Sequence, residues 1–485
     1  MTVRASAFAA VRWTSTAMIG RALIAVAQIV TLSRILDPAD FKLVALALTI
    51  VNIGIVFTDM GISNALIRFR DITAVELASL FWLNIMLGAG VTLVVAASCR
   101  LIAGFYGDPR LVPLILVAST VFFITSLGQQ QRALAEKSLR FDRLFWIDIS
   151  AAVAGFGTAV VLGLVGAGAF SIIVGNVVTA AGVAGLSWVL LAGDFRPSLT
   201  FDWTAAKRFL AYGANVVGFQ LCNAVALNGD VVLGGRMISG PALGYYFQPR
   251  DLCMRIMFMI NPVVNRVCFP LLESVAEDKS RVRAIYLKAI NMTASVNFPI
   301  YGFLAAFAPE VVDIVLGPKW HASGPLMRSV AIWCAVRSIG NPVGSLLLAM
   351  GETRRALLSA SGVAVAVFAA TAMGSWFGIG GIPVALAVLY GGLIPLFWLT
   401  LVRPTCQASF VEYHRVLVLP AIATIFAAVA AHLATLPVTG DIARLAVGGA
   451  VGLAAYLLAS YVTNRSVLVS TAELLMIKQL RSRLA

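Results

Sequence analysis

The chain is built from apolar runs of about 20 residues that recur along its whole length with short polar connections. A run of this length crosses the hydrocarbon core of a bilayer as a helix, which satisfies its own backbone hydrogen bonds. Hydrophobic residues make up 60% of the 485 positions and charged residues only 12%, which excludes an ordinary soluble domain. The sequence therefore predicts an all-α polytopic membrane protein with about fourteen transmembrane helices.

A weak repeat of about 200 residues divides these spans. The segments LSRILDPADFKLVALAL and GGRMISGPALGYYFQPR share an exit arginine, a helix breaker and an apolar restart. This pattern predicts two pseudo-symmetric six-helix lobes around a central cavity, although short hairpin loops that merely look alike are the alternative. We expect an N-lobe over 1–191, a cytoplasmic linker over 192–208, a C-lobe over 209–402, two extra spans over 403–462, and a basic amphipathic tail over 463–485.

The basic residues fall mostly on one side of the predicted spans. With the N-terminus in the cytoplasm, about 23 Lys and Arg residues, Arg132 among them, lie on that side and about 7 on the other. Both termini are then cytoplasmic, and a membrane accounts for the net charge of +14 better than a nucleic acid does, because no long basic run carries interleaved aromatics.

One span, 245–270, is unusual because it carries Arg250, Arg255 and Arg266. A guanidinium in hydrocarbon costs about 2.5–3.5 kcal/mol, so three of them must face protein, water or an anion. Asp251 lies one turn before Arg255 and can partly neutralise it. Together with two prolines that interrupt the backbone ladder, this predicts a bent helix that lines a cavity. Snorkelling or ion-paired arginines at the interfaces are the alternative.

Polar residues at seven-residue spacing form stripes on other spans, and Arg337 adds a further intramembrane cation. A concave interior of net basic charge attracts anions, and guanidinium groups suit phosphate oxygens. The candidate substrate-binding residues are Arg255, Arg266, Arg21, Arg337, Arg250, Gln28 and Asn223. The candidate coupling or gating residues are Asp59, Asp230 and Asp251.

No enzyme motif is present: the sequence has no P-loop GxxxxGK[ST], no GxSxG and no HExxH. The three histidines do not cluster, and the six cysteines have no CxxC spacing, so we expect no metal and no cofactor. Membrane carboxylates such as Asp59 and Asp230 also occur as H⁺ or Na⁺ coupling groups, and the alternative is that each pairs with a neighbouring arginine.

The run LSRILDPADFKLVALALTI, followed by FTDMGISNALIRFRDIT, resembles the polysaccharide transporter branch (Wzx-type and colanic-acid-exporter-like proteins) of the multidrug/oligosaccharidyl-lipid/polysaccharide (MOP) flippase superfamily. The segments FYGDPRLVPLIL, SGPALGYYFQPRDL and VVDIVLGPKWHASGPLM continue the likeness over roughly residues 10–360. Lys42, where the family usually has glycine, and the segment 248–250 depart from it.

The resemblance implies a flippase, not an enzyme, in the bacterial inner membrane. Its substrate would be an undecaprenyl-diphosphate-linked oligosaccharide, moved by alternating access from the cytoplasmic to the periplasmic leaflet for extracellular polysaccharide or O-antigen synthesis. The expected partners are this lipid-linked saccharide, the bilayer, and a polysaccharide polymerase with its co-polymerase. A cation-coupled multidrug extruder of the same superfamily and a membrane polymerase or ligase are the alternatives, and the basic interior and short external loops disfavour them.

Overall fold

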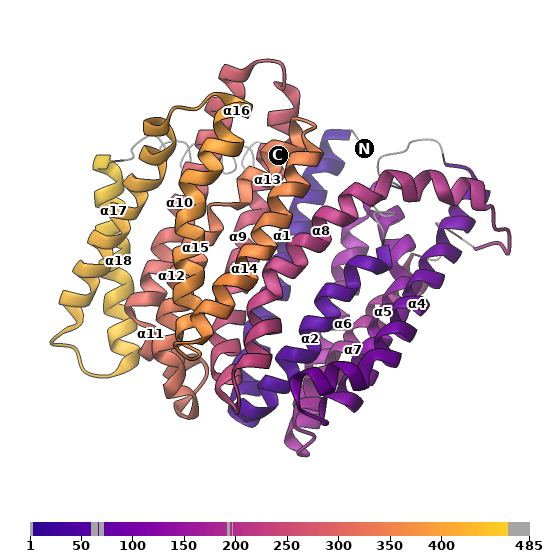
Figure 1. The fold of residues 1–485 in the computed structure, drawn as a ribbon, viewed down its shortest axis with the longest axis horizontal. Helices are drawn as coiled ribbons and strands as arrows, with labels where there is room; N and C mark the ends of the chain where they lie inside the picture. The colour runs from indigo at the N-terminus through magenta and orange to yellow at the C-terminus, as the bar shows by residue number, and fades with distance from the viewer. Residues whose placement is uncertain (1–2, 60–65, 67–71, 192–194, 196, 464–485) are drawn as a thin grey trace. The chain divides into compact units, whose positions relative to one another are not determined.

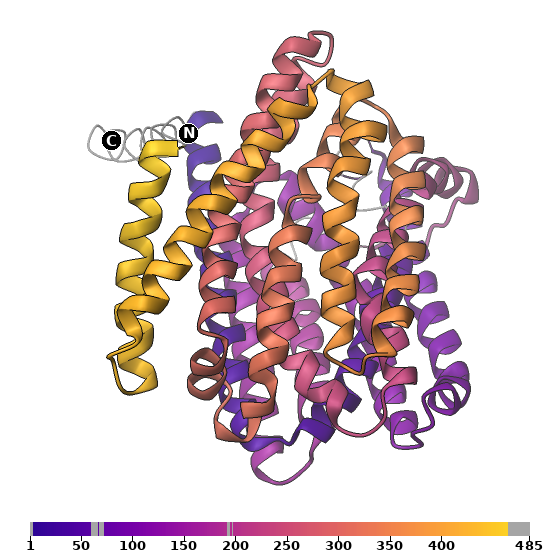
Figure 2. The same ribbon diagram turned by 60° about the vertical axis from the view of Figure 1, so that its left-hand side comes forward.

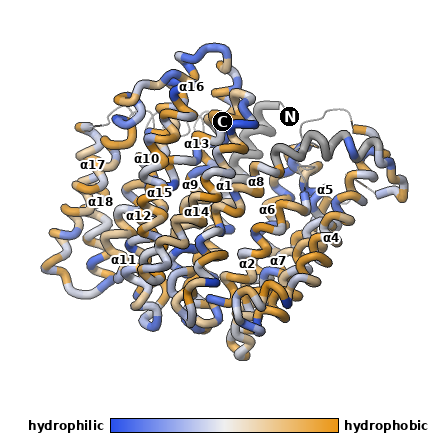
Figure 3. The backbone as a smooth tube through the Cα atoms, in the orientation of Figure 1, coloured by the Kyte–Doolittle hydropathy of each residue, from blue (hydrophilic) through white to orange (hydrophobic). Residues whose placement is uncertain are grey.

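The computed structural model describes residues 3–59, 66, 72–191, 195 and 197–463. Within these ranges, 13 helices are long and apolar enough to cross a membrane, or 14 if one bent pair counts as a single span. Figure 3 shows apolar residues along most of the length of the helices. The predicted fold class, an all-α polytopic membrane protein with about fourteen spans, is confirmed. The basic amphipathic tail over 463–485 lies, but for its first residue, outside the described residues.

The chain forms two compact units. Unit 1 comprises residues 1–248 and 357–372, and unit 2 comprises residues 249–356 and 373–485. Two helices, α9 (Ala242–Ser274) and α14 (Thr353–Ser375), pass from one unit into the other. The two predicted lobes of six spans around a cavity stay a prediction.

Unit 1 is a bundle in which α6 packs on α7, α4 on α5, and α1 on α6. These helices run from indigo to magenta in Figure 1. Their bounds are α1 (Val3–Ile35), α2 (Pro38–Asp59), α4 (Ala74–Tyr106), α5 (Leu111–Lys137), α6 (Phe141–Leu164), α7 (Ala169–Leu190) and α8 (Trp203–Met237). The α4 helix starts with a capping box between Thr73 and Glu76, which satisfies its free backbone N–H groups.

Unit 2 is built on α10, which packs against α17 and α12. Figure 2 shows α17 and α18 side by side as the yellow end of the chain. The bounds are α10 (Lys279–Ala306), α11 (Ala308–Val315), η1 (Pro318–Ser323), α12 (Gly324–Ser338), α13 (Asn341–Ala349), α15 (Gly381–Phe397), η2 (Trp398–Val402), α16 (Arg403–Cys406), α17 (Phe410–Thr435) and α18 (Asp441–Thr463).

Two of the predicted spans are broken helices. The apolar run over 290–315, which counts as one span by length, bends by 82° between α10 and α11, and Pro309 is the second residue of α11. The apolar run over 326–348 is likewise divided between α12 and α13, and Pro342 is the second residue of α13. Proline lacks a backbone N–H and is favoured in the first turn of a helix, where that N–H has no partner, so each break falls where a proline suits the start of the second helix.

The α6–α7 crossing is so close that a side chain larger than hydrogen does not fit at Gly155. A Cβ there would lie 1.9 Å from the Thr179 Oγ1 and 2.5 Å from the Gly175 carbonyl oxygen. Small residues at a crossing let two membrane helices approach closely, and packing replaces the hydrophobic effect there.

We expect Gly155→Ala to destabilise unit 1 by about 1–3 kcal/mol, because the overpacked helices must separate. The measurement is the midpoint of thermal unfolding of the purified protein in detergent. Gly157→Ala is the matched control, since a Cβ at Gly157 meets nothing within 4 Å. Equal midpoints for the two variants would contradict this description of the crossing.

Candidate functional site

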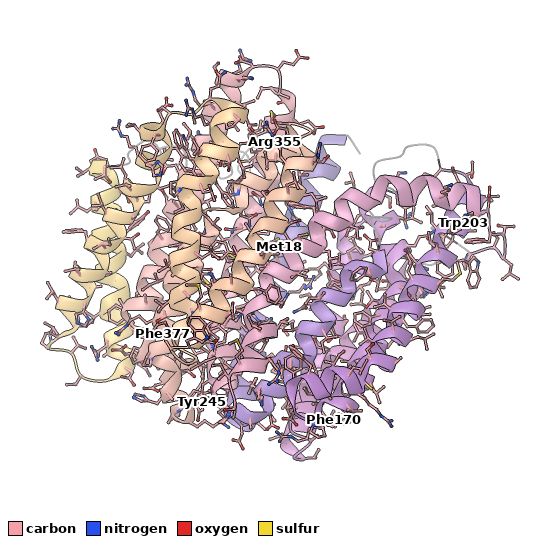
Figure 4. The ribbon with its side chains drawn as sticks, in the orientation of Figure 1. Met18, Phe170, Trp203, Tyr245, Arg355 and Phe377 are labelled. Atoms are coloured by element: carbon pink, nitrogen blue, oxygen red, sulfur yellow. The ribbon has the colours of Figure 1, made fainter. Side chains whose placement is uncertain are left out.

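A group of three charged side chains joins three helices of unit 1. The Asp148 carboxylate on α6 accepts hydrogen bonds from Arg132 Nη1 on α5 at 2.7 Å and from Arg21 Nη1 on α1 at 3.4 Å. Met18, labelled in Figure 4, lies one turn before Arg21 on α1. Arg21 was predicted as a site residue, whereas Arg132 was counted with the cytoplasmic-side charges and Asp148 was missed. The sequence signal for Asp148 was an acid inside the apolar run FWIDISAAV.

Local packing brings α1 and α6 together at the level of this group. A Cβ on Gly20 would lie 2.7 Å from the Ile149 Cδ1, so the two helices are in contact beside Arg21 and Asp148. One to two turns earlier, the rings of Trp13 and Phe145 lie 5.2 Å apart. These contacts bring the α1 guanidinium within reach of the α6 carboxylate.

The other predicted residues of unit 1 have separate surroundings. Asp230 on α8 is 1% exposed and accepts a hydrogen bond of 2.6 Å from the hydroxyl of Tyr246. Asn223 donates to the Phe219 carbonyl of its own helix at 3.1 Å. Gln28 is half-buried on α1, and Asp59 is the half-buried last residue of α2.

In unit 2, α9 carries the predicted arginines in different surroundings. Arg255 Nε donates to Asp251 at 2.6 Å, one turn away, as the sequence spacing predicted. Arg250 is buried at 6% exposure, and Arg266 is exposed. The helix continues through its three internal prolines as one element. The cavity predicted along this span stays a prediction.

Arg337 on α12 is held by aromatic rings. Its guanidinium donates to the Tyr390 hydroxyl, and its Cζ lies 4.9 Å from the centre of the Tyr390 ring and 5.8 Å from that of Trp333. No carboxylate lies within ion-pair distance of Arg337 in the part of the chain that the structure describes. A half-buried guanidinium with cation–π partners and no counter-ion keeps its full positive charge for another anion.

A buried amide network lies near this arginine in unit 2, and the sequence did not reveal it as a unit. The Asn297 amide nitrogen donates to the Asn261 side-chain oxygen at 3.1 Å, and Asn261 donates to the Ser338 carbonyl at 3.5 Å. Both asparagines are at most 1% exposed. Ser338 directly follows Arg337, so the network connects α9 and α10 to the end of α12 that carries Arg337.

Unit 2 also contains an apolar pocket of about 540 Å³ between α10, α17 and α18. Its walls include Val296, Phe303, Ala427, Gly449 and Leu453, with very few polar atoms. The two helices at its outer side, α17 and α18, were predicted as the extra spans that follow the two lobes. The pocket can receive a chain of hydrocarbon but offers almost nothing to a polar headgroup.

Thus some predicted residues form ion pairs within each unit. Arg21 pairs with Asp148 in unit 1, and Arg255 pairs with Asp251 in unit 2. Arg337 stands beside aromatic rings in unit 2. The predicted convergence of the arginines of both halves on one chamber stays a prediction.

Comparisons with known proteins agree on one family. The family model described as "Polysaccharide biosynthesis protein" matches residues 31–325. The chain is similar to the lipopolysaccharide biosynthesis protein WzxC of Escherichia coli (strain K12), with 29% identity over 72% of this chain and 71% of the relative. It is also similar to the teichuronic acid biosynthesis protein TuaB of Bacillus subtilis (strain 168), with 30% identity over 75% of this chain and 76% of the relative.

A solved structure shares the architecture. The lipid II flippase MurJ in an inward closed conformation superposes with a TM-score of 0.75, covering 94% of this chain and 99% of that protein, at 12% sequence identity. At this identity the likeness concerns the fold alone.

Proposed function

Since this chain belongs to the family of polysaccharide biosynthesis proteins, in the Wzx-type polysaccharide transporter branch of the MOP superfamily, we propose that it is a flippase for lipid-linked saccharides. It moves an undecaprenyl-diphosphate-linked oligosaccharide from the cytoplasmic to the periplasmic leaflet by alternating access. It acts in the bacterial inner membrane with both termini in the cytoplasm, upstream of a polysaccharide polymerase and its co-polymerase.

The observation that carries this proposal is the cationic chemistry inside a membrane protein. Arg337 has aromatic partners and no carboxylate in the described ranges, and Arg21 and Arg132 share the single carboxylate of Asp148. Because a guanidinium in or at the end of a membrane span must face water, protein or an anion, this surplus of positive charge favours an anionic guest. A diphosphate fits, since its oxygens accept the forked N–H groups of arginine.

The apolar pocket supports the lipid half of such a substrate. The walls of α10, α17 and α18 supply an apolar surface that can hold a prenyl chain without contact to polar groups. In this proposal, arginines bind the diphosphate headgroup and apolar walls bind the prenyl tail.

Coupling to an ion belongs to the same proposal. Asp230 is buried at 1% exposure beside the Tyr246 hydroxyl, which makes it the first candidate for an H⁺ or Na⁺ coupling group. Asp59 at the end of α2 is the second candidate. No separate cofactor enters the proposal.

The test is deletion of the gene in a cell that makes the polymer. We expect surface polymer to fall at least about tenfold and the lipid-linked repeat unit to accumulate in the cytoplasmic leaflet, with both defects reversed by the intact gene. Normal polymer in the deletion strain contradicts the proposal. Resistance to cationic dyes on overexpression, without any change in polymer, favours the multidrug extruder instead.

A further inference from the structure

We propose that Asp148 is an exchangeable counter-ion, and that a phosphate-bearing headgroup displaces it from Arg21 and Arg132 to bind between these two arginines in unit 1. This inference rests on the proposed function and adds to it a first binding site for the headgroup. Arg132 binds the headgroup there, and Asp148 is a positioning residue. The site lies entirely within unit 1.

The charges around Asp148 do not cancel. Two guanidinium groups share one carboxylate, and no second carboxylate lies within ion-pair distance of either arginine in the described part of the chain. Each guanidinium offers five N–H donors, and among the described residues one donor of each is bonded, to Asp148. The group therefore carries a net positive charge and many unused donors.

The two contacts differ in strength, which indicates how exchange can begin. Arg132 Nη1 lies 2.7 Å from Asp148 Oδ1, an ordinary charge-assisted distance, and its side chain is 23% exposed. Arg21 Nη1 lies 3.4 Å from Asp148 Oδ2, and its side chain is 61% exposed. Arg21 can therefore leave the carboxylate first and meet an incoming anion, while Arg132 stays in place.

A diphosphate is a better partner for this pair than Asp148 is. It carries more charge and more acceptor oxygens than one carboxylate, so it can accept forked hydrogen bonds from both arginines. In the absence of substrate, Asp148 prevents two like charges from facing each other without compensation. The carboxylate thus keeps the arginines near each other and sets a threshold that weak anions do not exceed.

The place of the group along the helices fits capture from the cytoplasmic leaflet. Arg132 lies near the end of α5, which ends at Lys137, and Asp148 lies near the start of α6, which begins at Phe141. In the proposed orientation both helix ends face the cytoplasm. A lipid-linked saccharide made on that side meets this group before it meets the other end of the spans.

The experiment measures binding of farnesyl diphosphate, a short soluble prenyl diphosphate, to the purified full-length protein in nanodiscs. We expect Asp148→Asn to bind it about five- to tenfold more tightly, because the competing carboxylate is gone. Asp148→Glu, which keeps the charge, should bind like the wild type. Arg21→Gln and Arg132→Gln should each bind about tenfold more weakly.

The control is a second Arg–Asp pair of the same unit. Arg110 Nη2 donates to Asp108 at 2.8 Å in the α4–α5 connection, and this hydrogen bond holds the pKa of the Asp108 carboxyl below its ordinary value. Asp108→Asn and Arg110→Gln should leave the affinity unchanged. The thermal unfolding midpoint of every variant shows whether it is folded.

Unchanged or weaker binding in folded Asp148→Asn overturns the exchange mechanism. If Asp148→Asn does not fold, the two arginine variants decide, and unchanged affinity in both overturns the site. Wild-type protein that exports polymer but does not bind farnesyl diphosphate also overturns the site without touching the proposed function, which fails only if the deletion strain still exports.

Discussion

Replacing Arg337 with alanine is expected to lower polymer export at least about tenfold, while the free energy of unfolding changes by only about 1 kcal/mol. The two effects separate because none of the described carboxylates pairs with Arg337, so the substitution leaves no carboxylate uncompensated there; its partners are the Tyr390 hydroxyl and the rings of Tyr390 and Trp333. The loss of these contacts changes the free energy of unfolding only modestly. Loss of the uncompensated charge removes a strong partner for an anionic headgroup.

The measurement is surface polymer in the deletion strain that carries each variant at equal protein level, together with the thermal unfolding midpoint. Arg328→Ala is the matched control on the same helix, since Arg328 is exposed and donates to the Ala305 carbonyl at 3.1 Å. It should export normally. Normal export by Arg337→Ala would refute the role of this residue. Polymer export by Arg337→Lys should lie between that of Arg337→Ala and that of Arg328→Ala, because lysine keeps the charge but cannot form two parallel hydrogen bonds to a phosphate.

Much of the fold could be predicted from the sequence, because hydrocarbon imposes a length and an apolar composition on every span. Breaks inside a span were harder to find. The residues on both sides of the 82° bend between α10 and α11 are apolar. The hydropathy of 290–315 therefore indicates one continuous helix. Pro309 was the available sign, but proline also occurs inside continuous helices here, as α9 demonstrates with Pro249 and Pro262.

For the candidate site residues too, contacts within one helix could be predicted from the sequence, whereas contacts between distant helices could not. The Asp251–Arg255 pair follows from i, i+4 spacing on one helix, and the structure confirms it. The partner of Arg21 could not be found so, because Asp148 lies 127 positions away and meets Arg21 only through the packing of α1 on α6. Likewise, Arg337 on α12 contacts Tyr390 on α15, and the spacing of residues within α12 gives no sign of this contact.

Within unit 2, Arg337 is a better candidate for headgroup contact than Arg255. Both residues are among the candidate binding residues from the sequence, and Arg255 lies on the span that carries three arginines. In the structure, the charge of Arg255 is already compensated by Asp251 at 2.6 Å, whereas that of Arg337 is not. Since a compensated guanidinium must give up a partner before it binds an anion, we rank Arg337 first within unit 2.

The largest effect on stability is expected for the ion pair between α11 and α18. Arg444 Nη1 donates to Glu310 Oε1 at 2.8 Å, and the Glu310 side chain is only 7% exposed. Arg444→Ala leaves this buried carboxylate without its cation, which costs about 3 kcal/mol, the lower end of the range for buried pairs because Arg444 is itself partly exposed. The midpoint of thermal unfolding in detergent should fall accordingly.

A double-substituted variant separates the cost of the stranded charge from the value of the pair. Glu310→Gln combined with Arg444→Ala removes both charges, so its unfolding midpoint should recover much of the loss seen with Arg444→Ala alone. Arg281→Ala is the control, because Arg281 and Asp278 form an exposed pair with side chains 73% and 48% exposed, and its midpoint should not change measurably. If the double variant is as unstable as Arg444→Ala, the loss reflects the packing of the arginine side chain instead of an uncompensated carboxylate, and the bent α10–α11 span does not depend on this ion pair for its charge balance.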